Sequence, residues 1–304
     1  MRTFMVGLVL MTTVWHTSPV GAQSSAMKPF DLNMDRVKVN TFGGKLGDSR
    51  TYFVPSYNLV VSVHGSVWAQ KGGAQAHGKF FVEGLTQSLM HELATKLQDD
   101  LVTRMRAAGY TVLTYDDLKN EADVVGRGRD KVNEKWGFPI RHATPLTYII
   151  AAPSEEQQFN NPGVGAAWPF RGIAKQKNLM VLSPEITFTV PQMYGQTRAG
   201  YSSNSAAIAT DPAMMLQGAW IAAVNGKGGT VNIMVQQHGM RLAADSTGII
   251  KQLSEQTYEF SKEWQRTSGD FTMTLDPVAF TDGIMRVGLA INAMIISELA
   301  KAHK

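Results

Sequence analysis

Serine, histidine and acidic side chains are present, but not at the spacings that catalytic motifs require. A serine hydrolase needs an exposed nucleophile, a histidine base and an orienting acid. Candidate nucleophiles cluster in one Gly/Ser/Asn-rich run, at Ser202, Ser203 and Ser205. That run lacks the glycine–serine–glycine elbow on which such a nucleophile sits. His91 precedes a glutamate, but residue 95 is threonine where a zinc-hydrolase helix needs a second histidine. We therefore predict no catalytic residue and no metal ligand.

Two further patterns also fit structural roles better than chemical ones. Met234, His238 and Met240 form a local group that could hold copper(I), but flexible core packing is the commoner role of methionine. The glycine-rich run at 226–230 resembles a phosphate loop only superficially, because its spacing is wrong and a strand, not a helix, is expected to follow. We interpret this run as a hairpin tip and predict no cofactor.

An irregular stretch at 153–176 carries the strongest binding signal. Phe159, Trp168 and Phe170 lie there among Asn, Gly and Pro, where no periodicity obliges them to point inward. Loops of this length are uncommon and often functional, and exposed aromatic side chains mark binding surfaces. We predict that these three residues bind a partner. The alternative is that they fold back as a lid over the core.

Composition excludes several classes of protein. The chain of 304 residues has no cysteine, so disulfides, thiolate catalysis and cysteine metal sites are excluded. Its formal net charge is +4, and the basic residues are scattered along the chain. Nucleic-acid binders concentrate such charge on one face, so we expect no nucleic-acid partner.

The N-terminus has the pattern of a signal peptide. Arg2 precedes an apolar run at 5–14, and small residues follow up to Ala22. That run is shorter than the roughly 20 residues that span a bilayer. We therefore predict a signal peptide over residues 1–22, cleaved after Ala22. The mature chain would be periplasmic or secreted in a bacterium, without a transmembrane anchor.

Two long helices stand out among the elements that would position these groups. Residues 80–115 read as an amphipathic helix, a stop at Gly109 and a strand at 110–115. The helix has an apolar ridge at every fourth residue: Leu85, Leu89, Leu93, Leu97, Leu101 and Met105. Asp276 and Pro277 open a second helix as its cap and first residue, and this helix closes the chain.

Most other segments read as strands joined by turns. Strand patterns fall at 36–42, 57–70, 145–152, 178–190, 230–236, 249–260 and 271–275. Pro184 predicts an edge or a bulge within 178–190. Residues 71–78 read as a loop, and 191–210 are small and polar. Residues 214–224 fit either a helix or a strand, and the turn at 225–229 favours a strand.

These elements predict an α+β fold, with a mostly antiparallel sheet covered on one side by the two long helices. Residues 23–304 would form a single layered domain. A subdivision near 126–144 is the alternative, although no linker marks it.

A local resemblance adds to this interpretation. The run Leu-Ala-Thr-Lys-Leu-Gln-Asp-Asp-Leu-Val-Thr-Arg-Met-Arg-Ala-Ala-Gly-Tyr-Thr-Val, starting at Leu93, resembles the helix-then-strand unit in periplasmic domains of the curli-secretion lipoprotein and related envelope proteins. It covers under a tenth of the chain, and the cysteine of the lipoprotein motif is missing. The resemblance implies a role in envelope assembly.

Three hypotheses about function follow. The first is an exported, non-catalytic envelope protein that binds a protein partner or an assembly through sheet edges or the aromatic loop. The second is a periplasmic carrier of an apolar small molecule, held between helices and sheet. The third is a hydrolase whose site is assembled from distant residues.

Overall fold

The computed structural model describes residues 30–42, 46–71, 74–159, 167–199, 204–236, 243–254, 257–260 and 265–303. The predicted signal peptide lies outside this described part. So do Ser202, Ser203, His238 and Met240, which were considered as candidates for chemistry.

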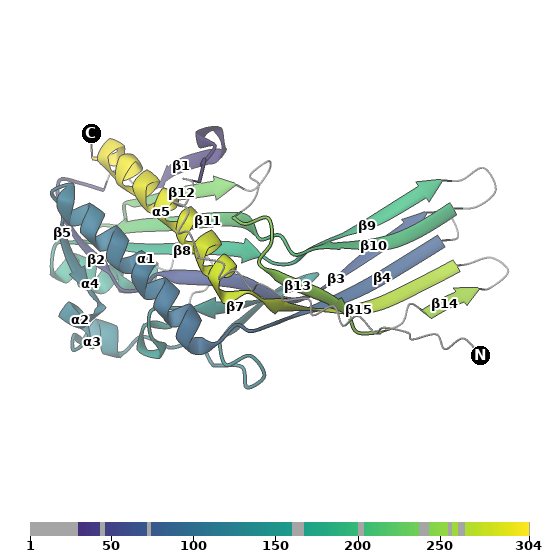
Figure 1. Cartoon of the computed structure of the whole chain (residues 1–304). Coiled ribbons are helices and arrows are strands. Elements are labelled where there is room, and N and C mark those ends of the chain that lie inside the picture. The colour runs from purple at the N-terminus through teal and green to yellow at the C-terminus, as the bar shows by residue number, and fades with distance from the viewer. Residues whose placement is uncertain are drawn as a thin grey trace, which may run out of the picture.

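A sheet of 13 strands forms the framework of the molecule (Figure 1). Its main path runs β1 (Val37–Phe42), β12 (Thr230–Gln236), β11 (Met215–Asn225), β8 (Met180–Thr189), β3 (Asn58–Lys71), β4 (Ala74–Glu83), β15 (Gln265–Leu275) and β13 (Gly248–Gln252). Attached to this path are β2 (Thr51–Val54), β5 (Thr111–Thr114), β6 (Ile140–Ala143), β7 (Leu146–Ala151) and β14 (Thr257–Phe260). A separate hairpin consists of β9 (Gln192–Ala199) and β10 (Asn204–Asp211).

The sheet is mixed. β4 and β15 are parallel, as are β3 and β8, and β2 is parallel to both β5 and β8. The remaining ladders are antiparallel, including the β3–β4 hairpin and the β8–β11–β12–β1 series.

Two long helices, α1 (Gln87–Ala107) and α5 (Pro277–Ala302), pack on one another and on one face of the sheet (Figure 1). The contact is close, because a Cβ at Gly288 of α5 would lie 2.4 Å from the Leu97 side chain of α1. α5 is long and apolar enough to cross a membrane, but 56% of that apolar window is buried inside the fold. Burial of this kind is typical of a core helix.

The predicted fold class is wrong. Strand residues outnumber helical residues, the sheet is mixed rather than mostly antiparallel, and the helices cover only part of it (Figure 1). Beyond the helices the strands continue as a projection that we call the arm. The arm comprises residues 66–71, 74–79, 257–260 and 265–270 with the β9–β10 hairpin. We call the remainder, which the helices cover, the body.

The arm has two layers. The β9–β10 hairpin has no ladder to the main sheet in the described chain, yet it packs across β3 and β4. A Cβ at Gly195 would lie 2.6 Å from the Ala69 Cβ, and one at Gly78 would lie 3.1 Å from both Ile208 and Met193. Small residues therefore allow the two layers of the arm to approach closely. A packed core, by contrast, is usually filled by large apolar side chains.

Several elements differ from those predicted. Residues 80–83 end β4 instead of starting the helix, and α1 begins at Gln87, where the Thr86 hydroxyl accepts the Leu89 N–H. β8 is a central strand rather than an edge or a bulge. Pro184 lies between the part of β8 that pairs with β2, at 180–181, and the part that pairs with β3, from 185, so it has no ladder partner on that side.

Other predictions are confirmed. Asp276 caps α5 by accepting the N–H groups of Val278 and Ala279. Residues 214–224 are strand, and the turn at 225–229 joins β11 to β12.

Short helices cover the second face of the sheet at the end remote from the arm: α2 (Tyr115–Leu118), α3 (Ala122–Val125) and α4 (Arg171–Gln176). They lie over a smaller core that includes Phe53, Val181 and Val224.

Candidate functional site

The three predicted aromatic residues lie near one another but in different environments. Phe170 is 1% exposed and belongs to the smaller core, where its ring meets Phe53 edge to face at 5.7 Å. The Phe159 ring packs on Phe170 with 4.9 Å between ring centroids, and the Arg129 guanidinium lies 4.1 Å from the centroid of the Phe159 ring. These two residues fold back over the core, which agrees with the alternative interpretation of this stretch as a lid.

Trp168 differs from these two. Its side chain is 48% exposed, and the Arg171 guanidinium lies 5.2 Å from its ring. A role of Trp168 in binding stays a prediction. Phe159 and Phe170 could contribute to such a surface only by supporting it from below.

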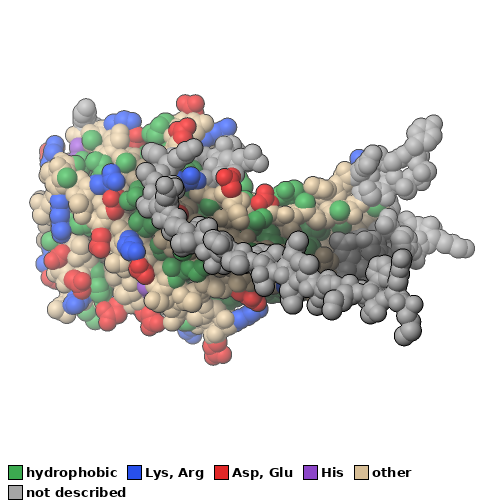
Figure 2. Space-filling view, viewed as in Figure 1, with side chains coloured by type: hydrophobic (Ala, Val, Ile, Leu, Met, Phe, Trp, Pro, Cys, Tyr) green, Lys and Arg blue, Asp and Glu red, His purple; other side chains and the backbone are tan. Residues whose placement is uncertain are grey.

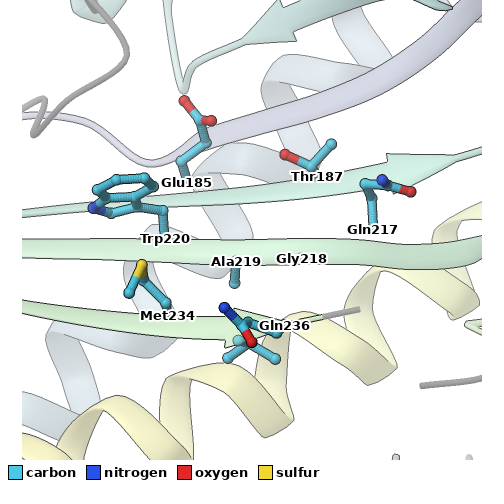
Figure 3. Close-up of a pocket in the computed structure, with 9 residues that line it drawn as sticks. Glu185, Thr187, Gln217, Gly218, Ala219, Trp220, Met234 and Gln236 are labelled. Atoms are coloured by element: carbon cyan, nitrogen blue, oxygen red, sulfur yellow. The ribbon is translucent and has the colours of Figure 1, made fainter. Parts of the chain in front are cut away.

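A shallow depression of about 450 Å³ lies on the face of the body sheet that α1 and α5 do not cover (Figure 3). Glu185 of β8, Trp220 of β11 and Met234 of β12 line it, with Thr187, Gln217 and Gln236 farther along the same strands. Arg141 binds both carboxylate oxygens of Glu185, at 2.6 and 2.9 Å, and this contact raises the pKa of Arg141. The Trp220 indole N–H donates to Asn232. The acid is thus held in an ion pair, and no histidine accompanies the Thr187 hydroxyl among the described residues that line the depression.

His64, His91 and His303 serve packing and hydrogen bonding. His91 Nδ1–H donates to the Ala152 carbonyl at 2.6 Å, and His303 contacts the Tyr52 hydroxyl at 2.8 Å. The His64 ring packs on Phe81 at 4.7 Å. Burial first, and then the charges of Lys135 and Lys79, lower the pKa of His64 below its ordinary value. Within the described ranges no three His, Asp or Glu residues are grouped as metal ligands.

The arm contains the most unusual feature, an unpaired sheet edge on β3. Residues 59–61 of β3 have ladders to β7 and β8, and residues 64–65 have ladders to β7 and β4, but residues 66–71 have a ladder only to β4. The Ser66 N–H donates to the Pro145 carbonyl, away from β4. Because backbone direction alternates along a strand, the N–H and C=O groups of Trp68 and Gln70 also point away from β4. In the described chain no strand forms a ladder with them there, although β9 lies alongside: a Cβ at Gly195 would be 3.0 Å from the Trp68 carbonyl oxygen.

Side chains do little to protect this edge. Natural edge strands avoid unwanted pairing through prolines, bulges or charges. The β3–β4 register is regular from His64 to Lys71, and that stretch of β3 contains neither proline nor bulge. Lys71 is its one charge, while Trp68 is 63% exposed. Figure 2 likewise shows charges spread over the body and few on the described part of the arm. An exposed tryptophan beside backbone groups without a ladder partner is typical of a docking edge.

A second edge lies on the other side of the same layer. β14 pairs with β15, and its far side has no partner strand in the part of the chain that the structure describes. The arm layer therefore runs β3–β4–β15–β14, with an open edge at each end.

Sequence reasoning missed the arm and its edges. Residues 71–78 and 191–210 were interpreted without strands, since small and polar residues give no strong alternation of large apolar side chains. The signal that could have found them was the alternation of Ala74, Ala76 and Gly78 with polar neighbours. This alternation continues into Phe80 and Val82, and all five are buried on one side of β4.

No protein-family model, no curated protein and no solved structure matches this chain. The resemblance of the run from Leu93 to envelope-assembly domains therefore stays a prediction.

Proposed function

We propose that this chain is a non-catalytic assembly protein whose arm pairs edge to edge with a second copy of the same chain. The observation that carries the proposal is the β3 edge at residues 66–71, which has no ladder on the side away from β4 in the described chain and toward which the backbone groups of Trp68 and Gln70 point. Pairing of a partner strand along such an edge is a recurring mode of recognition. The predicted signal peptide supports an exported setting in the cell envelope.

The second copy is favoured as partner because each arm offers both halves of the contact. β3 and β14 lie at opposite ends of one layer. Chain directions are compatible, since β3 is antiparallel to β4, β4 is parallel to β15, and β15 is antiparallel to β14. β3 and β14 thus run the same way, and a neighbouring copy in the same orientation would pair its β14 in parallel with β3. Such a head-to-tail contact repeats from copy to copy, as a ring or a filament.

A pair of substitutions at Gln70 tests the proposal. Gln70→Pro removes the outward N–H without removing a ladder bond to β4, whereas Gln70→Ala removes the same side chain and keeps that N–H. In sedimentation velocity we expect the mature wild type and Gln70→Ala to form oligomers and Gln70→Pro to remain a monomer. Circular dichroism verifies that both variants fold. A monomeric wild type at all accessible concentrations, or a Gln70→Pro variant that assembles like wild type, would contradict the proposal.

A groove of about 700 Å³ favours the carrier of an apolar molecule as a second candidate. Phe30 and Leu32 face Leu289 and Met294 of α5 across it, outside the helices rather than between helices and sheet, where core side chains fill the space. Native mass spectrometry of the purified chain tests this function. A co-purified lipid lost on Leu289→Gln would support it, and a lipid-free chain would not.

A further inference from the structure

A cleft of about 830 Å³ opens at the end of the body remote from the arm, beside α4 (Figure 1). Three segments form its walls: residues 46–49, residues 171–180 and the turn at 225–229 between β11 and β12. The last of these contains the glycine-rich run that the sequence presented as a hairpin tip.

The turn is held rigidly in place by Asn225. Its side-chain oxygen accepts the N–H groups of Lys227 and Gly229, at 3.0 and 2.8 Å, and its amide donates to the Leu46 carbonyl at 3.0 Å. One side chain therefore fixes the turn and ties it to the opposite wall of the cleft.

Glycines let the turn lie directly on α4. A Cβ at Gly226 would lie 2.3 Å from the Lys175 Cα, so no other residue fits between turn and helix. Gly228 has φ of +93°, and a Cβ there would lie 3.4 Å from the Arg171 guanidinium. Arg171 and Lys175 are four residues apart on α4 and so share one face of the helix. The turn adds Lys227 beside them.

Basic side chains therefore predominate among the charged residues of the cleft. Arg171, Lys175 and Lys227 line it together with one acid, Asp48. No ion pair is found for any of the three cations in the described part of the chain, whereas the neighbouring Lys177 pairs with Glu121 at 2.7 Å. Cations brought together in this way repel one another, and an anion in the cleft would relieve that repulsion.

We propose that this cleft binds an anionic phosphate group. A guanidinium matches two phosphate oxygens with parallel N–H bonds, and the two lysines that line the same cleft add compact charges. The phosphate could belong to a free small molecule or to a lipid headgroup, since the recognition chemistry is the same. The proposal is independent of assembly through the arm.

The experiment uses the mature full chain and two triple variants of equal charge. The first combines Arg171→Gln, Lys175→Gln and Lys227→Gln. The control combines Lys38→Gln, Lys131→Gln and Lys251→Gln, which are exposed cations outside the cleft. Inorganic pyrophosphate is titrated by calorimetry at low ionic strength. Phosphatidylglycerol vesicles, with phosphatidylcholine vesicles as reference, are tested by co-sedimentation.

We expect wild type and control to bind equally well, and the cleft variant to bind at least about tenfold more weakly. A pyrophosphate signal assigns the site to free phosphates, whereas a signal from phosphatidylglycerol alone assigns it to headgroups. Either result supports the proposal. Binding of neither probe by wild type, or equal losses in the cleft and control variants, would overturn it.

Discussion

Asn292 is the polar residue through which the two long helices are joined. Its side chain is fully buried, and its oxygen accepts the Tyr57 hydroxyl at 2.9 Å. Its amide donates to the Leu97 carbonyl and to Asp100, both at 2.9 Å. Burial and the nearby Asp100 raise the pKa of Tyr57, so its hydroxyl stays protonated and remains a donor. One amide thus connects α5, α1 and the start of β3.

Replacing this amide tests how much the network stabilises the fold. Asn292→Leu keeps the branched shape of the side chain but leaves the buried Tyr57 hydroxyl without its acceptor, and Asp100 retains only its contact with Arg104. We expect a loss of about 2–4 kcal/mol in the free energy of unfolding, measured by urea denaturation. Ser297→Ala, on the exposed side of the same helix, should change it by less than about 0.5 kcal/mol. Equal denaturation midpoints for the two variants would show that the network contributes no net stability.

At the scale of elements, the aromatic segment combines a core anchor with an exposed surface. Phe170→Ala should cost about 3–5 kcal/mol of unfolding free energy, because it empties a packed site in the smaller core. Trp168→Ala should cost less than about 1 kcal/mol, since the ring lies mostly in water beside Arg171. Thermal unfolding of both variants measures the difference, and similar losses would mean that Trp168 also packs as core.

Local signals predicted some elements well and others poorly. The Asp276 cap and the Gly109 stop are short-range features, and α5 and the end of α1 lie where they indicate. The start of α1 could not be located, because Val82 and Leu85 continue the apolar spacing of the helix although Val82 belongs to β4. Nor could the sequence predict which strands pair with one another. The strand that pairs with β4 in parallel follows almost 200 residues later in the chain.

The candidate site shows the same limit. Sequence alone could single out Trp168 as an aromatic residue in a polar stretch, but it could not separate Trp168 from the buried Phe170 two residues away. Nor could it show that Trp68 borders an open edge, because an edge is defined by the strands that do not pair with it.

On the scale of the whole molecule, a body packed by helices carries an arm that has no helix on either layer (Figure 1). The body has large buried side chains and the arm mainly small ones. Local stability should therefore fall along β3 and β4 from body to arm, because fewer apolar contacts restrain the distal ladder.

Hydrogen exchange measures this gradient. We expect amides in α1, α5, β8 and β11 to exchange slowest, and those in β9 and β10 to exchange much faster. The Trp68 amide should exchange as an open edge group in monomeric Gln70→Pro and become protected in assembled wild type. Uniform protection across body and arm, or a Trp68 amide that is equally protected in both, would contradict this view.

The parallel ladder between β4 and β15 also sets the order in which the molecule can be made. Residues 74–83 of β4 can pair with β15 only after residues 265–274 have been synthesised. The arm layer is therefore completed only when nearly the whole chain has been synthesised. A partly translated copy has no finished arm to offer a neighbour. We therefore expect the proposed contact between arms to form only between completed chains.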